Sequence, residues 1–281
     1  MDGQRHSDGR STPTVRRRWR RVTSLMAVMS VIAGVILRNG VDIVGLEEVG
    51  PNPPPIGPYD EGSDADRIAA QLTLRDPGNE TSPGTVTWHV YRDGTRALLT
   101  RDSSAGEGQW RFANENRRGF IRIVATERDF GEQAYIYDTH LSASPPTGGR
   151  AEQAQAIVDQ IATDRAVAEG AGHVFRAVLL GDLNEDVGDA VTTLTGAGMV
   201  SARDALPMPD GGRDGDTFIE ADSDGSILRG RVDHVWVGTH GGARDLSIDA
   251  GELDTAAGPN WDDATGGYSD HRPLVVQLSI L

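Results

Sequence analysis

The sequence predicts an α+β fold in which packed β-sheets form a layered sandwich with helices on the outside. Stretches with the pattern of strands outnumber those with helical spacing, and several strands follow one another directly along the chain. The 281 residues fit one large domain or two small ones, and the 37% hydrophobic content is enough for a sizeable core.

The N-terminal segment has two interpretations. Residues 1–21 hold seven arginines against two acidic residues, and we predict a basic, disordered arm there. Residues 25–37 form an apolar run that is either a core helix ending at Asn39-Gly40 or, with the arginines, a targeting segment. The run is shorter than the ~20 residues of a membrane span, which favours the core helix. Localisation stays open between cytoplasmic and secreted or membrane-anchored through residues 16–37.

The remaining elements alternate along the chain without internal repeats. Residues 51–55 are mostly proline and predict a stiff loop, whereas Asp93-Gly94 indicates a hairpin turn. A long polar loop is expected over about residues 207–230. We predict helices over residues 63–74 and 150–168, and strands over residues 41–46, 85–90, 95–100, 120–126, 134–141, 174–180, 232–237 and 274–280.

The composition excludes several chemistries. The chain has no cysteine and no lysine, so thiolate catalysis, disulfides, lysine Schiff bases and a P-loop lysine are impossible. Carboxylates, seven histidines, hydroxyls and arginines remain. Outside residues 1–21 the chain carries 20 basic and 40 acidic residues, a balance of −20. Such a body repels long DNA unless an arginine patch or divalent cations offset the charge.

Five apolar strands end in polar residues of catalytic type, in segments 41–48, 135–141, 178–184, 231–237 and 268–274. Each alone has an ordinary explanation, because Asp, Asn and Gly form turns after strands and a lone histidine is usually a core residue. Their convergence would gather carboxylates and imidazoles in one place. Such a cluster suits Mg²⁺ or Mn²⁺, with Ca²⁺ as an alternative, rather than a soft metal.

The ordered set Gly-Leu-Glu-Glu-Val, Asp-Thr-His-Leu, Gly-Asp-Leu-Asn, Val-Asp-His-Val and Ser-Asp-His resembles the endonuclease/exonuclease/phosphatase superfamily, which has the DNase I-like fold. Residues 96–101, residues 118–122, Arg150 and Gln153 add smaller matches, and the resemblance covers residues 31–281. It implies a single domain over residues 22–281, a four-layer α/β/β/α sandwich of two mostly antiparallel sheets flanked by helices. It also implies a divalent-metal-dependent hydrolase of phosphoester bonds.

The resemblance implies metal and water ligands among the matching residues. Glu48 would ligate the metal directly, and Asp270 would complete the metal site or its water shell. Asp182 and Asn184 would position the attacking water or the phosphate, with Asp182 also contacting the metal.

The resemblance also implies the acid–base groups. His271 would be the general base that activates water, and Asp233 would hold its ring in the useful tautomer. His140 would stabilise charge on the phosphoryl oxygens or assist the leaving group.

Two departures from the family pattern stand out. The usual first strand, whose Asn helps to ligate the metal, has no counterpart before residue 31. Three explanations stay open: the strand is degenerate, the true N-terminus lies elsewhere, or the protein has lost this metal ligand. Loss of the metal ligand predicts a weak or inactive family member that acts as a binding domain. Glu47 stands where the family usually has Gln, and Asp138 stands where Asn is common. Both add negative charge near the site, which favours binding of a cation.

Substrate class stays open among small phosphoesters, phospholipid head groups and nucleic acid. Arg118 and Arg101 are candidates for a substrate-phosphate contact, because guanidinium suits bidentate phosphate binding. The ordinary alternative is that they are surface arginines paired with nearby acids. No obligate protein partner is evident, and we expect a monomer.

Overall fold

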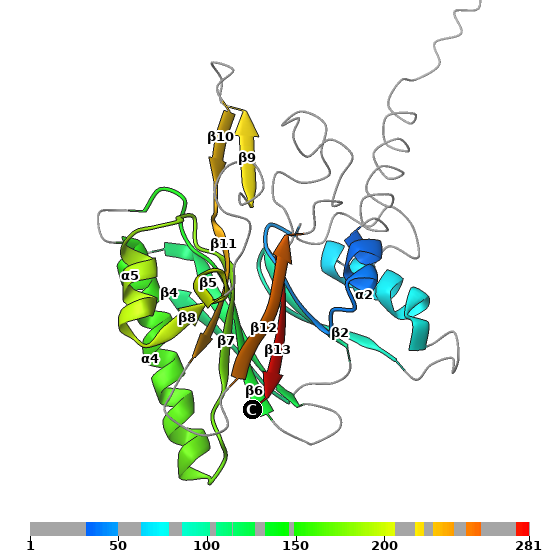
Figure 1. The fold of residues 1–281 in the computed structure, drawn as a ribbon, viewed down its shortest axis with the longest axis horizontal. Coiled ribbons are helices and arrows are strands. Elements are labelled where there is room, and N and C mark those ends of the chain that lie inside the picture. Colours follow the sequence, from blue (N-terminus) through cyan, green and yellow to red (C-terminus); the bar gives the residue numbers. More distant parts are fainter. Residues whose placement is uncertain are drawn as a thin grey trace, which may run out of the picture.

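The strands of this chain gather into two main sheets with helices on their outer sides, as a computed structural model shows (Figure 1). The α+β class is therefore confirmed. No helix in the described part is long and apolar enough to cross a membrane. The structure describes residues 32–49, 63–78, 86–101, 105–113, 115–126, 133–145, 149–205, 217–221, 227–238, 246–253 and 274–280.

The larger sheet has six strands in the order β4–β5–β6–β7–β11–β8. Neighbouring strands are antiparallel except β6 and β7, which run parallel. The long helix α4 (Gly149–Gly170) connects this parallel pair. The strands are β4 (Ala105–Phe112), β5 (Glu115–Thr126), β6 (Gln133–His140), β7 (Ala177–Asp182), β8 (Met199–Ser201) and β11 (Asp233–Gly238).

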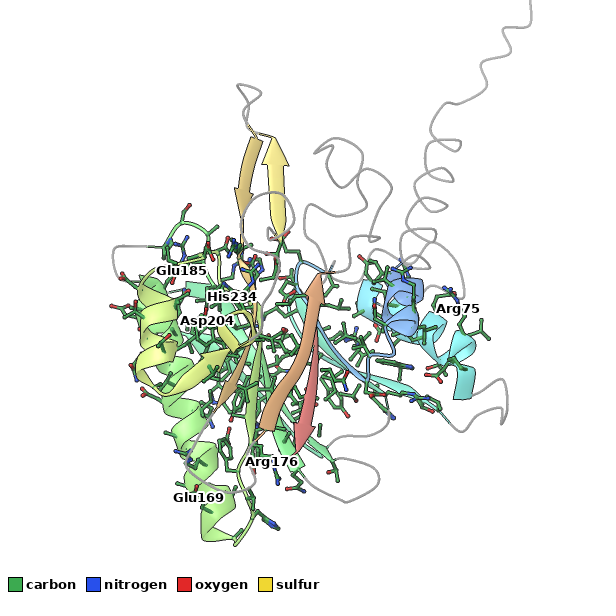
Figure 2. The ribbon with its side chains drawn as sticks, in the orientation of Figure 1. Arg75, Glu169, Arg176, Glu185, Asp204 and His234 are labelled. Atoms are coloured by element: carbon green, nitrogen blue, oxygen red, sulfur yellow. The ribbon has the colours of Figure 1, made fainter. Side chains whose placement is uncertain are left out.

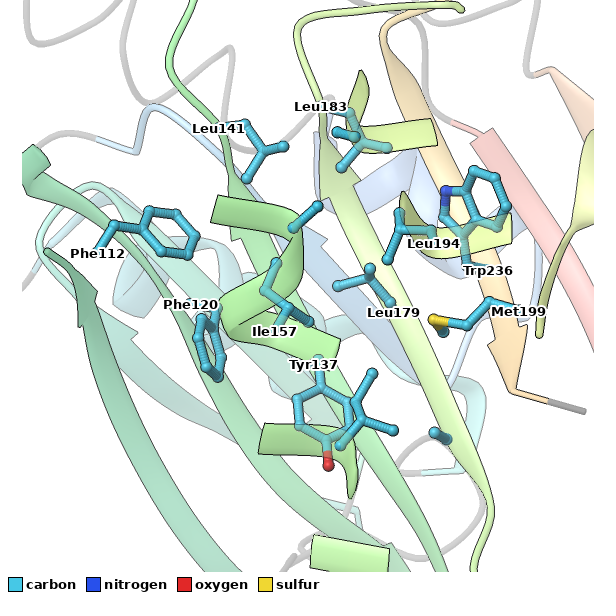
Figure 3. Close-up of a cluster of buried hydrophobic side chains, with 14 of the residues drawn as sticks. Phe112, Phe120, Tyr137, Leu141, Ile157, Leu179, Leu183, Leu194, Met199 and Trp236 are labelled. Carbon is cyan, nitrogen blue, oxygen red and sulfur yellow. The ribbon is translucent and has the colours of Figure 1, made fainter. Parts of the chain in front are cut away.

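Helices α4 and α5 (Asp189–Gly196) cover one face of this sheet (Figure 1). Ile157 of α4 and Leu194 of α5 pack with Phe120, Tyr137 and Leu179 of the strands (Figure 3). The phenol of Tyr137 donates a hydrogen bond to a carboxylate of α4 at the border of this core. Alanine and isoleucine at helical spacing along α4 produce this apolar face.

The smaller sheet has the order β1–β3–β2, formed by β1 (Ile43–Leu46), β3 (Arg96–Arg101) and β2 (Trp88–Asp93). Helix α2 (Asp64–Arg75) and the helical residues 32–38 pack their apolar side chains against it. Strands β12 (Leu246–Leu253) and β13 (Leu274–Ile280) form a separate antiparallel pair. Leu246 of β12 and residues of β1 and β3 pack in one hydrophobic cluster with residues of the larger sheet.

Local signals in the sequence explain where α2 begins and where the helix before β1 ends. Ser63 caps α2, since its hydroxyl accepts from the Asp66 N–H while the Asp66 carboxylate accepts from the Ser63 N–H at 2.6 Å. The described helix before β1 ends at Asn39-Gly40 as expected, and Gly40 has a φ of 62°. Residues 33, 35 and 36 of that helix are buried. Residues 1–31, with the predicted basic arm, lie outside the described residues.

Several elements differ from the sequence prediction. Strands β4, β8 and β12 and helices α5 and α6 (Ala202–Ala205) were not expected. The segment predicted as one loop over residues 207–230 contains a hairpin of β9 (Phe218–Ala221) and β10 (Ile227–Gly230). The strand expected over 174–180 runs from 177 to 182. In β4, glycines and charged residues form a strand because β5 offers a paired backbone, so tertiary context overrides propensity.

Candidate active site

Strand register brings three of the predicted residues side by side at one edge of the larger sheet. His140 lies opposite Asp182 in the parallel β6–β7 pair, and Asp182 lies opposite Asp233 in the antiparallel β7–β11 pair. His140 Nε2 is 3.3 Å from Asp182 Oδ2, and both side chains are about 95% shielded from solvent. Three segments far apart in the sequence therefore end in one polar row.

Glu48 reaches this row from the smaller sheet. It follows β1, which packs against β7, and its Oε1 lies 4.0 Å from His140 Nε2. Its side chain is 71% exposed, in contrast to its neighbours. Glu48 has a φ of 56°, a left-handed conformation that non-glycine residues adopt at a cost of about 1–3 kcal/mol. Such conformations cluster at functional sites.

Asn184 connects the ends of β6 and β7. Its backbone N–H donates to Asp182 Oδ1 at 2.7 Å, and its side-chain Nδ2 donates to the Leu141 carbonyl at 2.8 Å. Its φ of 54° is also left-handed, which asparagine tolerates better than most residues. These bonds fix the position of Asp182 relative to the residue that follows His140.

Two glycines of the sequence motifs allow the close packing beneath this row. Gly181 has a φ of 138°, and a Cβ on it would lie 1.9 Å from the Thr139 carbonyl oxygen. A Cβ on Gly45 would lie 2.5 Å from Asp138 Oδ1. A side chain at either position would force β6 away from its neighbours, so the glycine before Asp182 is a packing requirement of the site.

A pair of acids lies behind the row. The carboxyl groups of Glu47 and Asp138 lie close enough for the charge of each to affect the ionisation of the other. Burial raises the pKa of Asp138 to about 8. Burial also raises the pKa of Glu47 well above its usual value, followed by the negative charges of Asp138, Asp233 and Asp182. The fields of several carboxylates therefore converge at one place.

The structure separates the two candidate phosphate-binding arginines. Arg118 lies at the same edge as His140, since Phe120 of β5 pairs with Thr139 of β6. Arg101 is not brought to this row, because it ends β3 on the side away from Glu48. Its guanidinium donates to the buried carboxylate of Asp76 at 2.9 and 3.0 Å. The ordinary alternative, an arginine paired with nearby acids, therefore describes Arg101.

Asp270 and His271 lie outside the described residues. In the part of the chain that is described, no three acidic or histidine side chains are grouped so that they could hold a metal ion. Strand β13 begins three residues after His271, at the side of the fold where β7 ends (Figure 1).

The structure adds residues that the motifs did not indicate. Thr217 Oγ accepts from the backbone N–H groups of Val232 and Asp233, each at 3.0 Å. His234 Nε2 lies 2.8 Å from the Glu185 carbonyl oxygen, and burial lowers the pKa of this histidine. Glu185 and His234 lie close together at one end of the larger sheet (Figure 2). Neither Glu185 nor Thr217 carries a local sequence signal, because Glu185 stands three residues before Gly188, the N-cap of α5, and nothing marks Thr217.

Comparisons with known proteins identify a family and a shared fold. The sequence model of the Endonuclease/Exonuclease/phosphatase family matches residues 20–271. No curated protein sequence matches the chain. Solved structures with a similar fold include an endonuclease/exonuclease/phosphatase from Bacteroides vulgatus, at 18% identity over 90% of each chain with a TM-score of 0.61.

Two further structures with this fold carry names that state a ligand or an activity. D. rerio TDP2, complexed with a single-strand DNA product, is 15% identical over 90% of this chain and 92% of its own, with a TM-score of 0.60. A mannosyl-6-phosphatase from Bacteroides thetaiotaomicron is 15% identical over 91% of each chain, with a TM-score of 0.61. At these identities the likeness shows the shared fold.

Proposed function

The chain belongs to the endonuclease/exonuclease/phosphatase family, and we propose that it is a divalent-metal-dependent hydrolase of phosphoester bonds. The observation that carries the proposal is the polar row at the sheet edge. His140, Asp182 and Asp233 occupy adjacent register positions, and Glu48 comes within 4.0 Å of His140 from the other sheet. The proposal includes the four-layer α/β/β/α arrangement of the family.

The residues of the row fit Mg²⁺ or Mn²⁺. Their donor atoms are carboxylate oxygens, the ligands that these cations prefer, and the chain has no cysteine to attract a softer metal. The negative charges of Asp138, Asp233 and Asp182 act together on Glu47, after burial, to raise its pKa, and a bound cation would offset them. Glu48 and Asp182 would hold the ion together with Asp270. Bound there, the ion supplies positive charge to the phosphoryl oxygens and lowers the pKa of water.

The chain's own residues would perform the proton transfers. His271 takes the proton of the attacking water, and Asp233 orients the ring of that histidine. His140 stabilises the charge that develops on the phosphoryl oxygens. Asn184 keeps the ends of β6 and β7 together, so that His140 and Asp182 stay in contact.

For the substrate, we propose a small phosphoester rather than long DNA. Arg118 would contact a substrate phosphate, and the pairing of β5 with β6 supports this because it brings Arg118 to the end of the strands that carries His140. The charge balance of −20 outside residues 1–21 opposes binding of a long polyanion. The similar folds include a DNA-bound protein and a sugar phosphatase, so the fold itself does not choose.

A second candidate is a weakly active or inactive binding domain. It is motivated by the absence, before residue 31, of the Asn that normally helps to ligate the metal. The two candidates differ in whether any phosphoester is turned over.

The test is a metal-dependent activity screen with bis-p-nitrophenyl phosphate, p-nitrophenyl phosphate and plasmid DNA. We expect turnover with Mg²⁺ or Mn²⁺, and His140→Ala should lower kcat by about 10²–10⁴-fold. His173→Ala is the matched control, because His173 is an exposed loop residue at the other end of the larger sheet. No hydrolysis of any substrate together with no Mg²⁺ binding would refute the proposal and favour the binding domain.

A further inference from the structure

Arg150, in the first turn of α4, contacts both loops that leave the candidate site. The first loop, residues 141–145, follows β6, and the second, residues 183–188, follows β7. The guanidinium Nε donates to the Ser142 carbonyl at 2.9 Å, and Nη2 donates to the Ala143 carbonyl. The third nitrogen, Nη1, lies 3.5 Å from Glu185 Oε2. One side chain therefore ties the two loops together.

Gln153, three residues further along α4, holds the first loop at a second point. Its Oε1 accepts from the Ser142 N–H at 3.0 Å, and its Nε2 donates to the Ser142 hydroxyl at 2.8 Å. Gln153 is 1% exposed, so these bonds are shielded from water. Residues at i and i+3 share one face of a helix, which explains how both side chains reach one loop.

Glu185 anchors the second loop to the rest of the sheet. Its Oε1 accepts from the N–H groups of Ala190 and Val191 at 2.6 and 3.1 Å, which caps α5. Its carbonyl accepts from the ring of His234 on β11, next to Asp233. Arg150 therefore connects a loop that is already fixed to α5 and β11 with the loop that follows His140.

We propose that Arg150 is a positioning residue that holds His140 and Asn184 in register across the β6–β7 edge. This inference rests on the proposed function. Leu141, between His140 and Ser142, supplies the carbonyl that the Asn184 side chain bonds at 2.8 Å. If the two loops separate, this bond breaks and the Asp182–His140 contact changes. Among the described residues, Arg150 bonds two loop carbonyls and the Glu185 carboxylate, and we assign it to positioning these residues rather than to binding a substrate.

A guanidinium suits this task because its planar fork presents five donors in fixed directions. Three oxygen atoms from two separate loops, the Ser142 and Ala143 carbonyls and Glu185 Oε2, contact the same guanidinium. Lysine, with one ammonium group, has no equivalent geometry. Displacements of about 1 Å in catalytic groups cost roughly 10²-fold in rate, so a loosened loop should be visible in kcat.

The test compares Arg150→Ala, Arg150→Lys and Glu185→Gln with Arg165→Ala as the control. Arg165 lies on the same helix and pairs with Glu169 at 3.4 Å, far from the site. The first readout is hydrogen exchange of the Ser142 and Asn184 amides, which are bonded to Gln153 and Asp182. The second is kcat and KM with bis-p-nitrophenyl phosphate.

We expect Arg150→Ala to speed exchange of both amides by about 10-fold or more and to lower kcat by about 10–100-fold, with KM within about twofold. Arg150→Lys should restore only part of the amide protection and of kcat. Glu185→Gln should change exchange and kcat in the same direction by a smaller amount, and Arg165→Ala should change neither. If Arg150→Ala does not fold, Glu185→Gln decides, since glutamine still accepts the α5 N–H groups.

Unchanged exchange at both amides overturns the proposal, whatever happens to kcat. A raised KM with unchanged kcat also overturns it, since that result assigns Arg150 to substrate binding. An inactive wild-type protein refutes the proposed function instead. In that case the exchange measurement alone decides whether Arg150 holds the two loops.

Discussion

The Glu47–Asp138 pair shows how two acids, at positions where the family pattern has amides, change the protonation of the site. Asp138 is fully buried, and neither of its oxygens accepts a hydrogen bond from an N–H group of the described residues. The buried guanidinium of Arg96 lowers the pKa of Asp138, but the cost of burial is larger and leaves it raised to about 8. Near neutral pH the two acids therefore hold at least one proton between them.

This pair predicts that the metal-free protein loses stability as pH rises. Both pKa values are raised in the folded state, so the pair contributes most below the ordinary value of 3.8 for Asp, and that contribution is lost as pH rises through about 8. Glu47→Gln supplies an amide N–H that bonds the Asp138 carboxylate without a shared proton. We expect the variant to be about 1–3 kcal/mol more stable at pH 8, with a smaller change at pH 5.

Urea denaturation in EDTA at pH 5 and pH 8 measures this effect. Glu107→Gln, on the exposed side of β4, is the control and should keep the wild-type pH dependence. An equal loss of stability between pH 5 and pH 8 in wild type and Glu47→Gln would contradict the assignment of a shared proton.

Among the connections between elements, the hydroxyl of Thr217 links the base of the β9–β10 hairpin to the start of β11 in the larger sheet. Thr217, which is fully buried just before β9, accepts from the backbone where β10 continues into β11. Its own N–H donates to the Gly230 carbonyl at 2.9 Å. The start of β11, which carries Asp233, is therefore positioned by the base of the hairpin.

Thr217→Val should separate this role from simple packing. Valine has nearly the same shape but leaves two backbone N–H groups without their acceptor, which costs about 1–3 kcal/mol. We expect a lower urea midpoint and, because Asp233 shifts, a lower kcat. Thr217→Ser keeps the hydroxyl and should retain most of the wild-type stability to urea and most of kcat. Equal losses in the serine and valine variants would show that the methyl group matters rather than the hydrogen bonds.

At the scale of the whole molecule, the sequence predicted the strands that end in motif residues better than those that do not. Strands β1, β6 and β7 carry apolar runs followed by acids or histidine, and β11 carries one preceded by Asp233 and His234; each is found within a few residues of its predicted position. Strands β4 and β12 were missed because their alternation is confined to residues 109–112 and 246–250, next to glycines and charges, and their pairing depends on a neighbouring or a distant strand.

In the site, too, the sequence indicated the motif residues but not the contacts that support them. Motif order indicated His140, Asp182, Asp233 and Glu48, and the register places them together. Arg101 was a poor candidate because an arginine in a sequence does not show which acid it will pair with, here Asp76 across 25 residues. Supporting contacts depend on loop geometry, which local sequence patterns do not encode.

The convergence of carboxylates on one edge predicts that a divalent cation stabilises the whole fold. At a concentration about 100 times its Kd, a ligand that binds only the folded state adds about 2.7 kcal/mol. For a chain of this size we expect 10 mM MgCl₂ to raise Tm by roughly 5 °C. Glu48→Gln should reduce the rise by more than half. NaCl of matched ionic strength is the control, and an equal rise in NaCl would assign the effect to screening of the net charge of −15.

We propose that this acidic edge hydrolyses phosphoesters with a divalent metal. The most direct test is a Mg²⁺ titration of bis-p-nitrophenyl phosphate hydrolysis by EDTA-treated wild-type protein and Glu48→Gln. We predict no turnover without metal, a saturable rise with Mg²⁺, and at least about 100-fold lower kcat in the variant. Turnover that is independent of Mg²⁺, or equal in the two proteins, would contradict the claim.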